Sequence, residues 1–303
     1  GGADSSYMLH LAVKEFGLRP LVFHVDCGWN SNIAVSNINS LIDKLELDLY
    51  TEVINWEEIK DFQLAMFKSG VPHIDIPQDH AFLTTLYYYA EKYNIKNILN
   101  GYNISTEGIR NPLEFFYYGT DMIQNKYIIK KFATSQLKTY PFSSIFRHKI
   151  YLRYIKRIKV LKPLNFLPYK KEEAMSFLEK TYGWKRYPQK HFESRFTKFY
   201  EGYWLPSRFG FDPRRIQYSS LILTGQLSRK DALIKLKEPV YSKDELKQDK
   251  EFICKKLDIS INELENYHKL PKKFYWDYPN QGRIFNLGAK VLRKLGLEKS
   301  IKR

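Results

Sequence analysis

The sequence predicts an α/β fold in which a parallel sheet is flanked by helices and followed by a helical extension. Two observations lead to this prediction. Up to Gly183, short apolar runs alternate with amphipathic stretches of about 10 to 15 residues, which is typical of βαβ units. After Gly183, the pattern contains helical pieces and loops and no convincing strand. We therefore expect an α/β domain over residues 1–185 and a helical, loop-rich extension over residues 186–303.

The first two strands are expected to lie between helices. Apolar residues recur at helical spacing over residues 4–16, and Gly17 is suited to end that helix. The continuous apolar run at 21–25 predicts a strand that is buried on both faces of a parallel sheet. A helical stretch at 38–45 and an alternating stretch at 49–53 predict the next helix and strand.

The same alternation continues toward residue 183. Strands are expected at 95–99 and 158–161, and the first of these runs into a polar loop, 100–108, that contains two glycines. Helices are expected at 56–68, 81–93, 171–181, 214–223, 228–236 and 242–257. Because helices separate the strands, neighbouring strands are expected to run parallel.

The last residues form a basic amphipathic stretch, which starts near Leu287 and includes Arg303. Two interpretations remain open for this stretch. Its basic face is suited to an anionic surface or to nucleic acid, and its apolar side is suited to packing as a terminal helix.

Composition narrows the classes of protein that the chain can represent. A length of 303 residues with 44% apolar residues supports a full hydrophobic core and excludes a disordered tail or a mini-protein. Lysine and arginine number 49 and aspartate and glutamate 33, so the net charge is 49 − 33 = +16. This excess favours phosphorylated substrates, nucleic acid or an anionic membrane, and a lysine-rich surface explains it equally well.

Cysteine usage and hydropathy indicate in which cellular compartment the protein is expected. Cys27 and Cys254 are the two cysteines, and their separation fits neither a disulfide framework nor a C-x-x-C metal site. No apolar run reaches the length of about 18 residues that a transmembrane helix needs. We therefore expect a reduced, cytoplasmic protein without a transmembrane segment.

The first residues are suited to binding a phosphate group. Gly1 and Gly2 precede a predicted helix, where free backbone amides and the helix dipole attract an anion. Asp4 in the first turn would repel phosphate unless a divalent cation lay between them, which is why we expect Mg²⁺. An ordinary capped helix after a glycine turn is the alternative. Ligands of parallel sheets bind at the carboxyl ends of the strands, so this segment, Asp26 and the loop 100–108 are expected to share one cleft.

These first residues resemble the PP-loop of the ATP pyrophosphatase superfamily, S-G-G-x-D-S, of which the sequence holds all but the first Ser. The resemblance implies a Rossmann-like fold of the adenine nucleotide alpha hydrolase type. It also implies that the first strand of that fold, with the Ser at its end, precedes residue 1 in a longer chain. Enzymes of this kind cleave ATP between its α and β phosphates and adenylate a carbonyl oxygen of the substrate. The residues that the resemblance assigns to ATP are Gly1, Gly2, Asp4, Ser5 and Ser6, with Val25 and Asp26 near the adenine, and it makes Asp4 and Ser5 catalytic.

Two further segments extend this resemblance. The loop 100–107 is similar to the G-T-x-N-x-S-E loop of NAD synthetases, although Tyr102 replaces Thr and one extra residue precedes the acid. By that likeness, Gly101 contacts the nucleotide, and Asp4 and Glu107 are the carboxylates that bind Mg²⁺. Lys162, followed by Pro and Leu, is similar to a basic-Pro-Leu element of tRNA lysidine synthetases and related thiolases, which makes it a catalytic candidate.

The second half resembles the N-acetyl sugar amidotransferase family, whose members act in the making of lipopolysaccharide, O-antigen and related surface glycans. The segments that carry this resemblance are 190–199, 203–206, 209–215 and 219–226, followed by Ala232 and Leu233. Together with the PP-loop they cover the chain from Gly1 to about Tyr241. Members of this family usually begin with a Cys-bearing, zinc-binding segment, so Zn²⁺ is expected only in a segment that would precede residue 1.

The resemblance implies a reaction and its partners. An N-acetyl sugar or nucleotide-sugar is adenylated on its acetamido oxygen, and ammonia then displaces AMP to leave an acetamidino group. The ammonia is expected from a separate glutaminase that acts with a cyclase-like partner. Basic and polar residues of the second half are candidates to bind the anionic groups of the sugar. These residues are Lys190, His191, Glu193, Arg195, Arg214 and Arg215, of which His191, Glu193 and Arg195 alternate along a strand-like or loop segment.

Two other functions remain open. The charge of +16 is compatible with a PP-loop enzyme that modifies tRNA. Such enzymes often carry paired catalytic cysteines or a recognisable RNA-binding module, so two distant cysteines make nucleic acid an unlikely partner. A truncated remnant without activity, or a scaffold that docks the glutaminase pair, is the third interpretation.

Overall fold

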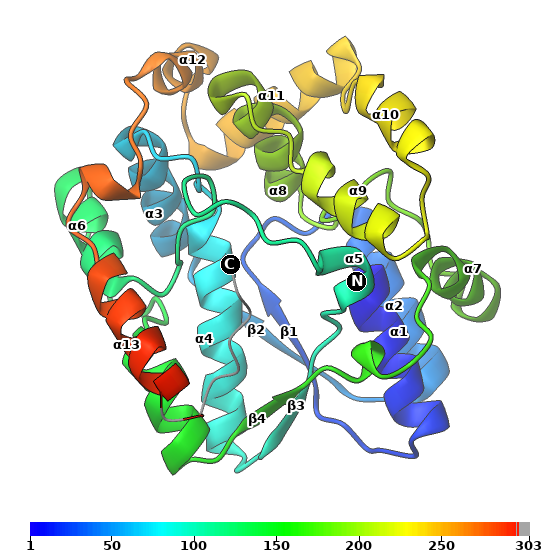
Figure 1. Ribbon diagram of the computed structural model, residues 1–303. Coiled ribbons are helices and arrows are strands. Elements are labelled where there is room, and N and C mark those ends of the chain that lie inside the picture. The colour runs from blue at the N-terminus through cyan, green and yellow to red at the C-terminus, as the bar shows by residue number, and fades with distance from the viewer. Residues whose placement is uncertain (295, 297–303) are drawn as a thin grey trace.

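The computed structural model describes residues 1–294 and 296, and it shows an α/β fold with short parallel strands among many helices (Figure 1). Strand β1 (Val22–Asp26) pairs in parallel with β2 (Leu49–Val53), with Val22 opposite Leu49. Strand β3 (Asn97–Leu99) pairs in parallel with β4 (Lys159–Leu161). The predicted strands and their parallel direction are therefore confirmed. Over the described residues they form two separate pairs and not one continuous sheet.

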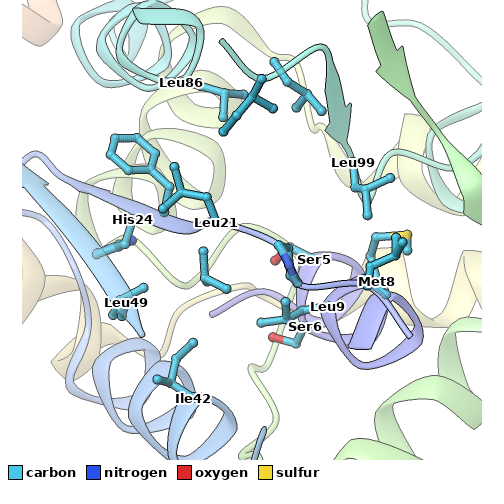
Figure 2. Close-up of a pocket in the computed structure, with 18 of the residues that line it drawn as sticks. Ser5, Ser6, Met8, Leu9, Leu21, His24, Ile42, Leu49, Leu86 and Leu99 are labelled. Carbon is cyan, nitrogen blue, oxygen red and sulfur yellow. The ribbon is translucent and has the colours of Figure 1, made fainter. Parts of the chain in front are cut away.

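A cavity of about 800 Å³ separates the two strand pairs (Figure 2). Residues 21–24 line it from the β1 side and residues 97–99 line it from β3. This cavity, which we call the inter-sheet slot, explains why one prediction is wrong. Within the run 21–25, expected to be buried on both faces, only Val25 is buried, and Leu21 is 45% exposed.

Three helices pack together on one side of the slot. Helix α1 (Ala3–His10) continues as a π-helical turn, η1 (Leu11–Glu15). Helix α2 (Asn32–Leu45) begins where the Ser31 hydroxyl accepts the Ala34 N–H, and α7 (Lys171–Tyr182) ends at Gly183, whose φ is +68°. Their apolar faces meet in one cluster that consists of Ala3, Leu41, Leu45, Leu178, Tyr182 and Trp184. The start of the chain is therefore held in a fixed place.

The largest core lies on the other side and joins the two halves of the chain. It is built on α3 (Trp56–Ser69) and α4 (Ile76–Lys92), against which α6 (Met122–Phe132) packs. Phe62 and Phe67 of α3 share this core with Phe196 and Trp204, which lie in the extension expected from residue 186. The extension thus packs directly against the α/β part.

The remaining elements are helical. In chain order they are α5 (Ile104–Glu107), η2 (Arg147–Ile155), η3 (Pro163–Asn165), α8 (Arg195–Phe199), η4 (Tyr200–Phe209), α9 (Arg214–Leu223), α10 (Arg229–Lys237), α11 (Lys243–Leu257), α12 (Ile261–Lys269), η5 (Tyr275–Asp277) and α13 (Gly282–Lys294). The helices predicted from periodicity are present, and the described residues after Gly183 form no strand. Among all the residues that the structure describes, no helix is long and apolar enough to cross a bilayer.

Two buried carboxylates of α3 hold a loop against the core. Asp61 accepts hydrogen bonds from the backbone and hydroxyl groups of Thr134 and Ser135. Glu58 accepts the backbone N–H groups of Lys138, Thr139 and Tyr140. Burial opposes the charge on Glu58, but these backbone donors outweigh it and hold the pKa of the carboxyl below its usual value.

We expect Glu58→Gln to lower the free energy of unfolding by about 1.5 to 3 kcal/mol, because an amide replaces a charged acceptor of three N–H groups. Since the pKa of Glu58 is lowered in the folded state, its contribution is present above the unfolded pKa of about 4.3 and is lost as pH falls further. Urea unfolding of both forms at neutral and acidic pH measures this. The control is Glu57→Gln, on the exposed side of the same helix. Equal losses in the two variants would contradict the prediction.

Candidate active-site cleft

A polar cleft of about 1040 Å³ opens where the two halves of the chain meet. Its walls come from the start of α1, the loop and helix α5 that follow β3, the start of α7, the segment 184–193, and helices α9 and α10. This volume is at the upper end of the range of about 300 to 1000 Å³ for ligand sites. The cleft therefore has room for a nucleotide together with a second ligand.

Asp4 and Glu107 converge on a single cation in this cleft. The Lys190 ammonium lies 2.5 Å from Glu107 Oε1 and 3.8 Å from Asp4 Oδ2. The Tyr169 hydroxyl donates a hydrogen bond to Asp4 Oδ1. The pKa of Tyr169 is raised, first by burial and then by the Asp4 charge, so this phenol stays a donor at neutral pH. The structure thus brings together the two carboxylates that the sequence assigned to Mg²⁺.

A close contact with Gly101 holds the loop after β3 against the start of α1. A Cβ atom at position 101 would lie 2.8 Å from the carbonyl carbon of Asp4 and 2.9 Å from the Ser5 nitrogen. Only glycine leaves room for this approach. Asn103 then accepts the Thr106 N–H at 2.9 Å and starts the single turn of α5 that carries Glu107. Gly101 therefore lies at the cleft, where the sequence placed it.

The first residues are anchored by the segment that follows α7. The Gly1 carbonyl accepts hydrogen bonds from Trp184 Nε1 at 3.0 Å and from the Tyr187 hydroxyl at 3.2 Å. The Glu193 carboxylate lies directly against Gly2, where it occupies the space that a side chain would need. Gly2 precedes α1 without a side-chain cap, and the first N–H groups of a helix have no partner within the helix. The residues of this first turn line the cleft, and the phosphate cradle stays a prediction.

The two predicted serines of this segment lie in different places. The Ser5 hydroxyl donates to the Gly2 carbonyl at 3.0 Å, and Ser5 borders both the cleft and the inter-sheet slot. Ser6 is buried, and it lines the inter-sheet slot but not the cleft. Of the two, Ser5 is therefore the one that a ligand in the cleft reaches.

Burial lowers the pKa of Lys171, which was not a predicted site residue, and of Lys162, which was one. Lys171, the first residue of α7, lines the cleft near Asp4, Glu193 and Glu107, and burial is the largest cause of its lowered pKa. The sequence analysis did not single it out, because a lysine at a helix start has no motif of its own. Burial also lowers the pKa of Lys162, whose ammonium lies 3.7 Å from the centre of the Tyr102 ring. Lys162 is not among the residues that line the cleft.

Residues 190–193 form a turn, so the strand-like alternative for this segment is wrong and the loop alternative is confirmed. His191 has a φ of +67°, an unusual value for a residue with a side chain, which breaks the alternation expected for 191, 193 and 195. Lys190, His191 and Glu193 line the cleft, and Arg195 does not. His191 Nδ1 lies 3.0 Å from Glu201 Oε1. Burial opposes protonation of this imidazole, but the Glu201 charge prevails and raises its pKa to about 9.

The three predicted arginines lie outside the cleft. Arg195 donates to Asp249 Oδ1 at 2.6 Å and stacks on the Phe252 ring at 3.6 Å. Arg214 pairs with Asp212 at 2.8 Å and caps the end of α10 through backbone carbonyls. Arg215 is exposed on α9. These positions give Arg195 and Arg214 structural contacts, and a role in sugar binding stays a prediction for all three.

Val25 and Asp26 also lie outside the residues that line the cleft. Val25 is buried in the main core. Asp26 Oδ1 accepts the Gly28 N–H at 2.7 Å and shapes the turn after β1. Their assignment to the adenine therefore stays a prediction.

Both cysteines are buried and free. Burial raises the pKa of the Cys27 thiol well above its usual value, and it raises the pKa of Cys254 to about 11. Both pack in the main core, which agrees with the interpretation of Cys27 as a small apolar residue.

The donor set of the cleft is suited to Mg²⁺ that is shared with a phosphate. Over the described residues, no group of three or more His, Cys, Asp and Glu side chains could hold a metal ion alone. Mg²⁺ commonly binds one or two carboxylates together with substrate phosphates and water. Asp4 and Glu107, which meet at one ammonium, fit this pattern.

Comparison with known families identifies part of the chain. Residues 193–292 match the model of the C-terminal domain of LPS biosynthesis proteins of the WbpG-like type. This stretch is similar to that domain. The resemblance to lipopolysaccharide biosynthesis proteins is therefore confirmed in this coarse form, for a region that contributes α9 and α10 to the cleft wall. Comparison with curated proteins gives no match.

We expect Glu201→Gln to lower the pKa of His191 from about 9, because the carboxylate charge that outweighs burial is lost. The ion pair contributes stability that is fully present below the unfolded histidine pKa of about 6.5 and is lost as pH rises through 9. NMR titration of the His191 ring protons measures the shift. The matched control is Glu238→Gln, another carboxylate of the cleft. A His191 pKa that stays near 9 in Glu201→Gln would contradict this assignment.

Proposed function

We propose that the protein is an ATP-dependent amidotransferase that converts the acetamido group of an N-acetyl sugar or nucleotide-sugar into an acetamidino group. One observation carries this proposal: Asp4 and Glu107 meet at the glycine-flanked start of α1, in a cleft whose other wall matches a domain of LPS biosynthesis proteins. The product serves lipopolysaccharide, O-antigen or related surface-glycan synthesis. We place the reaction in the cytoplasm, where ATP is available.

The reaction has two balanced steps. The acetamido oxygen attacks the α-phosphorus of ATP. The bond between that phosphorus and the oxygen that bridges the α and β phosphates breaks, and pyrophosphate leaves. Ammonia then attacks the carbon of the adenylated group and loses a proton. The bond from this carbon to the former amide oxygen breaks, and AMP leaves with that oxygen. Adenylation is needed because an amide oxygen is otherwise a poor leaving group. The acetamidino product, AMP, pyrophosphate and the released proton account for all atoms of the reactants.

The residues at the start of α1 are suited to the ATP side of the cleft. Gly2 and Ser5 line the cleft, and the backbone amides at this helix start, with the Ser5 hydroxyl, would bind the phosphates. Mg²⁺ bound by Asp4 and Glu107 would neutralise the phosphate charge and polarise the α-phosphoryl group. Lys171, whose ammonium lies near both carboxylates, would balance the charge of the departing pyrophosphate.

The other wall is suited to the sugar. Gln217 and Tyr218 of α9 line the cleft opposite α1, and amide and hydroxyl groups of this kind bind sugar hydroxyls. Lys190 and His191 supply positive charge for an anionic group of the substrate. The extension 186–303 thus serves as the substrate-binding part in this proposal.

Ammonia comes from partner proteins in this proposal. Neither buried thiol is suited to the nucleophilic attack that a glutaminase needs, because burial raises the pKa of both. A separate glutaminase with a cyclase-like partner would deliver unprotonated ammonia to the cleft. Zinc in a segment before residue 1 stays a prediction.

The Rossmann-like PP-loop fold is also part of this proposal. The inter-sheet slot lies between two parallel strand pairs and is lined by apolar side chains of α1, α2 and α4, as a further parallel strand would require (Figure 2). A strand that precedes Gly1 would join both pairs into one sheet.

We expect a six-residue prefix of alternating valine and isoleucine that ends in serine to raise the midpoint of thermal unfolding by several degrees. The physical reason is burial of its side chains between two helix layers, with strand hydrogen bonds on both edges. Differential scanning calorimetry measures the midpoint. A prefix of six glycines and serines is the control, and equal midpoints for both prefixes would refute the added strand.

We expect Asp4→Asn and Glu107→Gln to lower sugar-dependent release of pyrophosphate from ATP at least about a hundredfold, because each removes a charged ligand of Mg²⁺. The assay uses acetamido sugars, ammonium salts and Mg²⁺, and binding of Mn²⁺ with ATP, followed by electron paramagnetic resonance, is the second readout. Glu173→Gln, on the exposed surface of α7, is the control. Absence of sugar-dependent pyrophosphate release in the unmodified chain, combined with salt-sensitive tRNA binding, would instead favour a tRNA-modifying enzyme.

A further inference from the structure

Helix α13 is amphipathic along its length and leaves an apolar row exposed. Ile284, Leu287 and Val291 recur at i, i+3 and i+7, so they lie along one side of the helix. Their exposed fractions are 45%, 64% and 47%. No residue of α13 is buried. Within the described part of the chain, a large part of each of these three side chains therefore faces solvent.

The helix is nevertheless held in place at its first turn. The Gln281 N–H donates to Asp121 Oδ2 at 2.6 Å, and the edge of the Phe285 ring packs on Tyr118 with centroids 4.9 Å apart. Figure 1 shows α13 at the outer edge of the molecule, beside α6 and away from the candidate cleft. The apolar row thus lies on a surface that is anchored to the fold and separate from the candidate active site.

The charge on α13 is of one sign. At 100° per residue, the basic side chains lie on one side of the helix, in an arc that also contains Asn286 and that borders the apolar row. These side chains are Arg283, Lys290, Arg293 and Lys294. No aspartate or glutamate occurs from residue 278 to residue 297. An apolar row bordered by basic side chains, without an acidic residue, is the composition of helices that lie in the interface of anionic membranes.

We propose that α13 is an interfacial helix that binds this protein to an anionic phospholipid bilayer. Ile284, Leu287 and Val291 enter the boundary between headgroups and acyl chains, and the bordering lysines and arginines contact lipid phosphates. The charge pattern favours a bilayer over an acidic protein, because a bilayer presents anionic groups and an apolar layer along the whole helix, of about 20 Å. This inference does not depend on the proposed amidotransferase reaction.

The test is co-sedimentation of the chain with vesicles of phosphatidylcholine, with and without phosphatidylglycerol. We expect binding only to the vesicles with phosphatidylglycerol, and binding that weakens as salt is raised. Leu287→Gln combined with Val291→Gln should lower the partition coefficient about tenfold or more, since two side chains no longer gain from leaving water. Lys290→Gln combined with Lys294→Gln should weaken the salt dependence, since two of the four basic side chains of the helix are lost.

A matched control is available on α10. Leu233 and Ile234 are each 51% exposed, and lysines lie close to them in sequence. Leu233→Gln combined with Ile234→Gln should leave binding unchanged, and circular dichroism should show equal helix content in all variants. Failure of the unmodified chain to bind vesicles with phosphatidylglycerol would overturn the proposal and favour an acidic protein partner. Equal binding by the unmodified chain and the Leu287/Val291 variant would also overturn it.

Discussion

The candidate site depends on the contact between Gly101 and the peptide that joins Asp4 to Ser5. A Cβ atom at position 101 would overlap this peptide, so any other residue would push the loop after β3 away from α1. Because Asn103 starts the turn that carries Glu107, such a displacement would also separate the Glu107 and Asp4 carboxylates. One position without a side chain thus sets the geometry of the proposed metal ligands.

Features of the fold that depend on neighbouring residues in the sequence were predictable. Features that depend on contacts with distant segments were not. Helix α11 begins at a serine that accepts a backbone N–H group, and glycine ends α7, so these limits are encoded nearby. The start of α2 at Asn32 was missed, because the prediction followed only the apolar spacing over 38–45. The burial of β1 was predicted wrongly because it depends on what borders its second edge. That edge faces the inter-sheet slot, which no pattern within residues 21–25 reveals.

The candidate site was predictable where its residues belong to the glycine-flanked helix start or to the loop after a predicted strand. Asp4, Gly101 and Glu107 have such positions, and the fold brings them together. Lys171 and Tyr169 have no motif and become visible only through their neighbours. The arginines were predicted to bind substrate, but they lie outside the cleft. A guanidinium binds a carboxylate of its own chain as readily as a substrate anion, and Arg195 and Asp249 make such a pair.

The position of Lys190 has a consequence for any divalent cation in the cleft. Its ammonium lies where Asp4 and Glu107 meet, and two cations cannot share that position without strong repulsion. Mg²⁺ therefore requires Lys190 to move, and Lys190 directly precedes His191, whose backbone is in the left-handed region. The same turn holds Glu193 against Gly2. If Mg²⁺ binds there as proposed, the movement of Lys190 would also act on the glycine segment that is proposed to bind phosphate, since one turn contacts both.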